Sequence, residues 1–199
     1  PARITLDFDG SVQSTKRHAE GTAVGFNKKK KGARSYYPLF CTIAQTLQVF
    51  DFLHRSGNVH DSNGAKAFIL SCIDAVQAVS PNVQIEVRMD SAFFSDEIVM
   101  ALAARGVEFT ISVPFERFVE LKKIIEQRRR WRPWDVDTWY FETSWKPQCW
   151  DRRFRFLFIR TRAKKQHKGP VQLDLFVPHE YGYEFKVIVT NKTLCADRV

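Results

Sequence analysis

The spacing of hydrophobic residues along the chain alternates between a strand-like period of two and a helical period. Ile4, Leu6 and Phe8 alternate with polar residues, which is typical of a half-buried strand. Runs of branched and aromatic residues predict further strands over residues 36–44, 47–54, 83–89, 107–113, 152–162, 171–177 and 183–190. Apolar residues at helical spacing predict helices over residues 63–79, 96–105 and 115–130.

This order of elements favours a mixed α/β fold. Three strands come first and strands then alternate with helices up to residue 130, so we expect a mixed sheet with helices on its faces. The composition shifts after this point, because all five tryptophans lie between Trp131 and Trp150. We therefore expect three parts, which are a core over residues 1–130, a β-rich insertion over 131–178, and a final core strand with the chain end over 179–199.

The composition excludes several classes of protein. The chain has 199 residues, of which 44% are hydrophobic and 14% aromatic, so it can bury a core and is not intrinsically disordered. No apolar run reaches the roughly 18–20 residues that span a bilayer, and residues 1–9 lack the pattern of a signal peptide. The four cysteines form no CxxC pair, so we expect buried free thiols in a reducing cytoplasm.

The net charge of +9 belongs to one internal segment. Residues 116–168 hold 16 basic and 7 acidic residues, whereas the rest of the chain holds 15 of each. A surplus confined to one region points to a polyanionic partner that faces it. A second, smaller basic run, Lys28–Lys31, lies within residues 11–34, a polar and glycine-rich stretch that predicts an extended loop or irregular ribbon.

Basic side chains in these two regions are candidates for contact with DNA phosphates, which gives affinity without reading sequence. The residues predicted to bind DNA are Arg128, Arg129, Arg130, Arg132, Arg153, Arg155, Lys28, Lys29 and Lys30. The lysine run has a plainer interpretation as a solvated loop. The tryptophans beside the arginines also have two interpretations, as the apolar core of the insertion or as platforms on which unpaired bases stack.

Two aspartates stand at the ends of predicted strands. Asp9 closes the first strand and Asp90 closes the strand over residues 83–89. Residues at the ends of neighbouring central strands project into one crevice, where two carboxylates repel unless a cation lies between them. Mg²⁺ or Mn²⁺ suits such a site, because these ions prefer oxygen ligands. Two alternatives stay open: either aspartate can be a turn former, and Asp7, on the same face as Asp9, can be the true first ligand.

Four short segments carry a family resemblance. Asp9-Gly10-Ser11, Arg55–His60, Arg88–Phe94 and Val187–Lys192 resemble, in order, motifs of the DDE transposases of bacterial insertion sequences. The first and third resemble the segments around the two catalytic aspartates, and the fourth resembles the strand before the last catalytic helix. The resemblance implies an RNase H-like mixed sheet flanked by helices, with a β-rich insertion. It also implies catalytic and metal-binding roles for Asp9 and Asp90.

The activity implied by this resemblance is DNA transposition, by strand cleavage and strand transfer at transposon ends with Mg²⁺ or Mn²⁺. The sequence departs from the family at the third acid, a glutamate on a helix after the last strand. Only residues 191–199 follow that strand here, and Glu180 and Glu184 lie before or within it. We therefore expect a fragment without the last catalytic helix, which binds divalent metal weakly and does not complete strand cleavage by itself.

The resemblance also implies partners and a location. The partner is double-stranded DNA, both as transposon ends and as target, and the intact protein is expected to form a homodimer. The location is the cytoplasm of a bacterium, in association with the nucleoid. Two other functions remain open. One is a structure-selective DNA nuclease of the same fold, and the other is a non-catalytic DNA-binding remnant whose acidic residues are structural.

Overall fold

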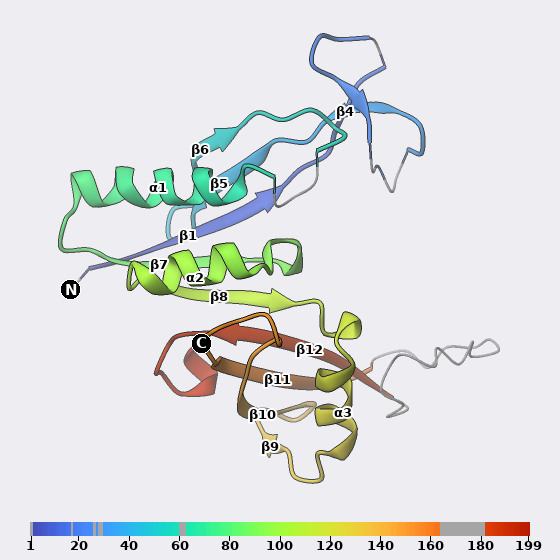
Figure 1. Cartoon of the computed structure of the whole chain (residues 1–199), viewed down its shortest axis with the longest axis vertical. Coiled ribbons are helices and arrows are strands. Elements are labelled where there is room, and N and C mark those ends of the chain that lie inside the picture. The colour runs from blue at the N-terminus through green and yellow to red at the C-terminus, as the bar shows by residue number, and fades with distance from the viewer. Residues whose placement is uncertain (1, 17, 26, 28–29, 60–62, 164–181) are drawn as a thin grey trace. The chain divides into compact units, whose positions relative to one another are not determined.

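The computed structural model has a mixed α/β architecture and describes residues 2–16, 18–25, 27, 30–59, 63–163 and 182–199. The chain forms two compact units, residues 1–109 and residues 110–199 (Figure 1). The bounds that we predicted for the core, the insertion and the chain end stay predictions. Among the described residues, no helix has the length and apolar character needed to cross a membrane.

The first unit contains a sheet with the strand order β6-β5-β1-β7. The central strand β1 pairs antiparallel with β5 and parallel with β7. The elements are β1 Arg3–Gly10, β2 Gln13–Ser14, β3 Ala23–Val24, β4 Arg34–Tyr36, β5 Leu39–Ile43, β6 Gln48–Leu53, α1 Ala65–Val79, β7 Gln84–Met89, the 3₁₀ turn η1 Ser91–Phe93 and α2 Asp96–Ala104. Strand β8, Glu108–Val113, begins here and continues into the second unit.

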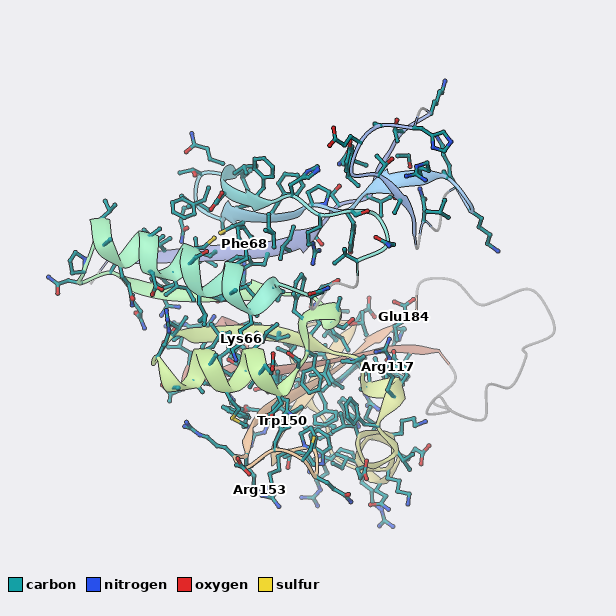
Figure 2. The ribbon with its side chains drawn as sticks, turned by 45° about the horizontal axis from the view of Figure 1, so that its top comes forward. Lys66, Phe68, Arg117, Trp150, Arg153 and Glu184 are labelled. Atoms are coloured by element: carbon teal, nitrogen blue, oxygen red, sulfur yellow. The ribbon has the colours of Figure 1, made fainter. Side chains whose placement is uncertain are left out.

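The core of the first unit follows the predicted periodicities. Leu6 and Phe8 are buried on one face of β1, which confirms the alternation seen in the sequence. Helix α1 buries one face on this core, and its Phe68 ring meets Phe8 edge to face at 5.9 Å (Figure 2). Helix α2 begins where Ser95 caps it, since the Ser95 hydroxyl accepts a hydrogen bond from the Ile98 amide.

A second, three-stranded sheet with the order β2-β4-β3 occupies the stretch in which we predicted a loop or ribbon. Its strands have only two or three residues, which is too short for a periodic pattern to appear in the sequence. The Gly57 amide donates a hydrogen bond to the Ser35 carbonyl, and a side chain on Gly25 would collide with the Gly57 carbonyl. This sheet therefore packs closely on the turn that follows β6.

The second unit contains antiparallel strands in the order β8-β12-β11-β10-β9. Strand β12 spans the residues predicted for it. The elements are the 3₁₀ turn η2 Phe115–Arg117, α3 Val119–Gln127, β9 Arg132–Pro133, β10 Thr138–Trp145, β11 Phe154–Arg162, β12 Tyr183–Thr190 and the 3₁₀ turn η3 Ala196–Arg198.

Aromatic rings fill the core of this unit. Phe141 and Phe158 stack at a centroid distance of 4.5 Å, and the edge of Trp131 meets Phe141 at 4.7 Å. Trp145 contacts Phe156 in the same way at 5.0 Å, and each of the other three tryptophans also has an aromatic neighbour. Trp150 is buried, which supports the interpretation as apolar core for this residue. Trp131, Trp139 and Trp145 are half-buried and Trp134 is 37% exposed, so both interpretations stay open for these four.

Some predicted ends are wrong. The helix expected over residues 115–130 begins only at Val119, because Phe118 is extended and the preceding residues form η2. The strand expected over residues 36–44 begins at Leu39, after Pro38, which has no amide hydrogen to donate to a strand ladder. The strand expected over residues 171–177 lies outside the described residues.

The cysteine prediction is confirmed for Cys41 and Cys72 and wrong for the other two. All four are free thiols, but Cys149 and Cys195 are exposed, because they lie in the turn after β10 and in the segment after β12. Cys41 on β5 and Cys72 on α1 are buried together. The hydrogen bond to Cys72, together with burial, raises the pKa of the Cys41 thiol.

Candidate active site at the ends of β1 and β7

The register of two parallel strands brings Asp9 and Asp90 together. Phe8 of β1 pairs with Met89, the last residue of β7, and each is followed by an aspartate: Asp9 within β1 and Asp90 directly after β7. Residues paired in parallel strands project to the same face of a sheet, and adjacent strands lie roughly 4.8 Å apart. Both aspartates are exposed. The site is therefore two carboxylates at the carboxyl ends of neighbouring strands.

Asp90 has the turn-forming role considered for it, and its role as a metal ligand stays a prediction. Its backbone is extended, and its Oδ1 accepts a hydrogen bond from the Ala92 amide at 2.9 Å, which caps η1. A carboxylate offers about four acceptor positions, and this cap uses one of them. The cap fixes the direction in which the carboxylate points. The turn-forming and ligand roles are thus compatible.

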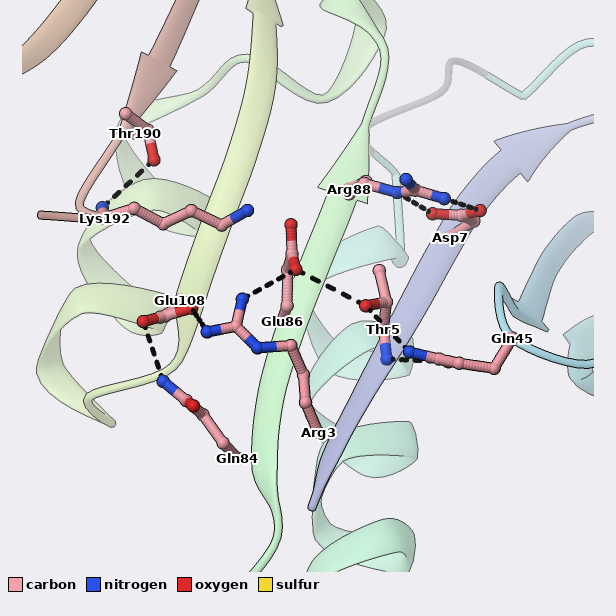
Figure 3. Close-up of polar contacts among 10 residues, drawn as sticks. All are labelled: Arg3, Thr5, Asp7, Gln45, Gln84, Glu86, Arg88, Glu108, Thr190 and Lys192. Atoms are coloured by element: carbon pink, nitrogen blue, oxygen red, sulfur yellow. Dashed lines mark hydrogen bonds and ion pairs between the residues drawn. The ribbon is translucent and has the colours of Figure 1, made fainter. Parts of the chain in front are cut away.

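Asp7 is held by an arginine. Register pairs Asp7 with Arg88, and the guanidinium donates to both carboxylate oxygens at 2.6 and 2.7 Å (Figure 3). The hydrogen bond to Asp7 raises the pKa of Arg88. Asp9 makes no ion pair with another described residue. Asp9 is therefore the better candidate for the first ligand, and this assignment stays a prediction.

The part of the chain that the structure describes contains no group of three His, Cys, Asp or Glu side chains able to hold a metal ion. Glu86 of β7 accepts hydrogen bonds from Arg3 at 3.2 Å and from Thr5 at 3.4 Å (Figure 3). Glu184 is an exposed residue of β12, and Glu180 lies outside the described residues. Two carboxylates still fit Mg²⁺, which usually takes one or two of them together with water and substrate phosphates.

The turn after β6 supports the site through a chain of contacts. Arg55 is buried, and its Nε donates to the Tyr37 carbonyl at 3.0 Å while its guanidinium lies 5.2 Å from the Tyr37 ring centre. The Tyr37 ring in turn packs on Gly10, where an added Cβ would lie 2.5 Å from the Tyr37 Oη. A side chain at position 10, next to Asp9, would therefore require the Tyr37 ring to move. The sequence motifs suggested neither this support nor the reason for Gly10.

The predicted DNA-binding arginines lie on the surface of the second unit. Arg129, Arg130 and Arg132 are exposed at the end of α3 and in β9. The guanidinium of Arg128 lies 4.7 Å from the Phe141 ring centre, and Arg153 donates to the Ser144 carbonyl at 3.1 Å. In the first unit Lys30 is exposed, and Lys28 and Lys29 lie outside the described residues. Their contact with DNA stays a prediction.

Arg155 has a structural role that the sequence did not reveal. Its Nε donates to Glu142 of β10 at 2.5 Å, and its Nη1 donates to the carbonyls of Lys192 and Leu194 at 3.0 and 2.6 Å. One guanidinium thus fixes the chain that leaves β12. These partners are 37 and 39 residues away in sequence, so no local pattern could indicate them.

Replacing Arg155 with alanine is expected to lower the free energy of unfolding by about 2 kcal/mol, because three hydrogen bonds to a charged group are lost at a half-buried position. Urea denaturation measures the change. The matched control is Arg153→Ala, which loses one exposed hydrogen bond and should change stability by less than about 0.5 kcal/mol. Equal effects of the two substitutions would contradict the role given to Arg155.

Comparisons with known proteins bear on the family and the fold of the chain. Residues 1–190 match the family described as Transposase DDE domain group 1. Among solved structures, the chain is similar to a cryo-EM structure of a piggyBac transposase synaptic complex with hairpin DNA, with a TM-score of 0.55 and 10% sequence identity. The match covers 98% of this chain and 34% of the piggyBac transposase chain, so this chain spans about a third of the length of the piggyBac transposase. No curated protein sequence matches. The structural likeness confirms the predicted RNase H-like class of mixed α/β fold.

Proposed function

Because the chain belongs to the Transposase DDE domain group 1 family, we propose that it is the catalytic core of a protein that performs DNA transposition. The reaction is cleavage and transfer of DNA strands at transposon ends, and the element is a bacterial insertion sequence. The observation that carries this proposal is the parallel register of β1 with β7, in which Asp9 and Asp90 directly follow the paired residues Phe8 and Met89. In the family, a pair of aspartates in this order belongs to the catalytic site.

We propose that Asp9 and Asp90 hold Mg²⁺ or Mn²⁺. When bound, such ions activate water and stabilise the leaving oxygen of a phosphodiester. The residues of this chain fix the ligands: the Ala92 amide orients Asp90, and Tyr37 packs on Gly10 beside Asp9. Arg88 neutralises Asp7, which directs a cation to Asp9 instead.

Double-stranded DNA is the proposed partner, as transposon ends and as target. The similar piggyBac transposase was solved with hairpin DNA, and the basic surplus of residues 116–168 supplies the charge that a phosphate backbone requires. The intact protein is a homodimer in this proposal, because two transposon ends are joined in one reaction. It acts in the bacterial cytoplasm, on the nucleoid.

Replacing Arg128, Arg129 and Arg130 with alanine is expected to flatten the salt dependence of DNA binding. Each lost phosphate contact lowers the slope of log K against log salt by about 0.9, so the slope should fall by between about 1 and 3. Fluorescence anisotropy of a labelled duplex between about 50 and 200 mM salt measures it. The control removes three exposed charges elsewhere, at Lys66, Lys186 and Arg198. A slope that stays the same in the arginine variant would count against these contacts.

The proposed function is tested in cells with the intact protein. Terminal inverted repeats should flank its coding gene, and a marked element that carries those ends should be excised when the protein is supplied. Excision should be lost with Asp9→Asn and with Asp90→Asn, and retained with Asp135→Asn, an exposed aspartate between β9 and β10. Failure of the unsubstituted protein to excise an element with its own ends would contradict transposition.

A further inference from the structure

A hollow of about 590 Å³ lies in the second unit, between the turn that joins β10 to β11 and the chain that leaves β12. We propose that this hollow, here called the β12-end pocket, binds a phosphate group of a DNA backbone. The identification of DNA as the source of the phosphate rests on the proposed function. The residues that carry the argument are Arg152, Arg153, Arg155, Glu142, Thr193 and Cys195.

The charges around the β12-end pocket favour an anion. Its lining has four basic residues and one acidic residue, Glu142. That carboxylate already pairs with Arg155 at 2.5 Å. Arg152 and Arg153 make no ion pair with any other described residue. Two guanidinium groups thus face the pocket without a carboxylate to neutralise them, which attracts an anionic ligand.

The arginines are held in place before any ligand binds. The Arg152 guanidinium lies 5.3 Å from the Phe154 ring centre, and Arg153 donates one hydrogen bond from Nη1 to the Ser144 carbonyl. Arg155 uses Nε and Nη1 for the fold. A guanidinium has five N–H donors, so each of the three retains donors after these contacts. Side chains ordered in advance lose less entropy on binding, and a planar fork of donors matches phosphate oxygens.

The lining also indicates a phosphate that belongs to a polymer. Arg152, Arg153, Thr193 and Cys195 are exposed, so the pocket opens to solvent and a strand can lay one phosphate into it without threading through a closed cavity. Only two lining residues, Phe154 and Leu194, are large and apolar. A pocket for a drug-like organic molecule is instead lined mainly by hydrophobic and aromatic side chains. Figure 2 labels Arg153 on the turn that borders the pocket.

Cys195 provides a reporter inside the pocket, because it lines the hollow and its thiol is exposed. The experiment measures the rate at which N-ethylmaleimide alkylates Cys195 in the 199-residue chain, by mass spectrometry, with and without a duplex whose binding is followed by anisotropy. With the duplex at ten times its Kd, the site is free about a tenth of the time, so alkylation should slow roughly tenfold. Arg152→Gln together with Arg153→Gln should abolish this protection at equal occupancy of the duplex.

The control variant removes two exposed charges elsewhere, Lys66→Gln and Lys186→Gln, and should keep the protection. A duplex that binds without slowing the alkylation of Cys195 would overturn the pocket while leaving DNA binding intact. A duplex that does not bind at all would overturn both the pocket and the proposed function. Protection by inorganic phosphate but not by the duplex would assign the pocket to a free phosphate, which also overturns the proposal.

Discussion

Replacing Asp9 with asparagine is expected to weaken Mn²⁺ binding by the 199-residue chain by at least about tenfold. Substituting residues that only hydrogen-bond to metal ligands already lowers metal affinity by about tenfold or more, and Asp9 is a proposed ligand itself. The substitution removes one of two negative charges at the ends of β1 and β7 and leaves a neutral amide in the same space. Electron paramagnetic resonance of free Mn²⁺ measures the affinity directly. Asp90→Asn should weaken Mn²⁺ binding by a similar factor, because it also removes one negative charge from the site. The asparagine oxygen can still cap η1, so the local fold should be kept.

The matched control is Asp7→Asn, on the same strand and the same face. This substitution breaks the ion pair with Arg88 but should leave Mn²⁺ affinity unchanged, because the Asp7 carboxylate is not available to a cation. Without metal, Asp9→Asn should not lower the melting temperature, since it relieves repulsion between two carboxylates. A larger loss of affinity in Asp7→Asn than in Asp9→Asn would make Asp7 the first ligand and contradict the assignment.

Replacing Phe158 with alanine is expected to lower the free energy of unfolding of the second unit by about 3–5 kcal/mol. The ring is fully buried in β11 and stacks on Phe141 at 4.5 Å with an interplanar angle of 6°. Truncation therefore removes a large apolar surface and leaves a cavity between β10 and β11. All five tryptophans lie in this unit, so tryptophan fluorescence in urea follows its unfolding.

Two further variants show whether the loss reflects burial. Phe158→Leu fills most of the cavity and should lose distinctly less stability than Phe158→Ala. Val136→Ala, at a side chain of the second unit that is 87% exposed, should change stability by less than about 0.5 kcal/mol. Comparable losses for Val136→Ala and Phe158→Ala would contradict the core described for the second unit.

Local sequence patterns predicted the elements with strong periodicity. The run of branched and aromatic residues over 183–190 predicted the bounds of β12 without error, and the helix predicted over residues 96–105 begins at Asp96 as expected. The three helices and most long strands were found within a few residues of their predicted ends. The short strands of the second sheet were missed, because two or three residues carry no period.

The candidate site shows what the sequence can and cannot provide. The motifs selected Asp9 and Asp90, but only the register of β1 with β7 places them at one level. The same register pairs Asp7 with Arg88, which are also 81 residues apart and lie two residues before Asp9 and Asp90. Once the parallel pairing of β1 with β7 is assumed, this ion pair is therefore predictable from the sequence. The contacts of Arg155 and the packing of Tyr37 on Gly10 depend on tertiary structure alone.

The most direct test of the central claim, that Asp9 and Asp90 form one cation site, is anomalous diffraction from crystals of this chain grown with Mn²⁺. We expect an anomalous peak roughly 2.1 Å from a carboxylate oxygen of Asp9 and a similar distance from one of Asp90. A peak bound by Asp7 instead, or ordered Asp9 and Asp90 carboxylates with no peak between them at saturating Mn²⁺, would contradict it.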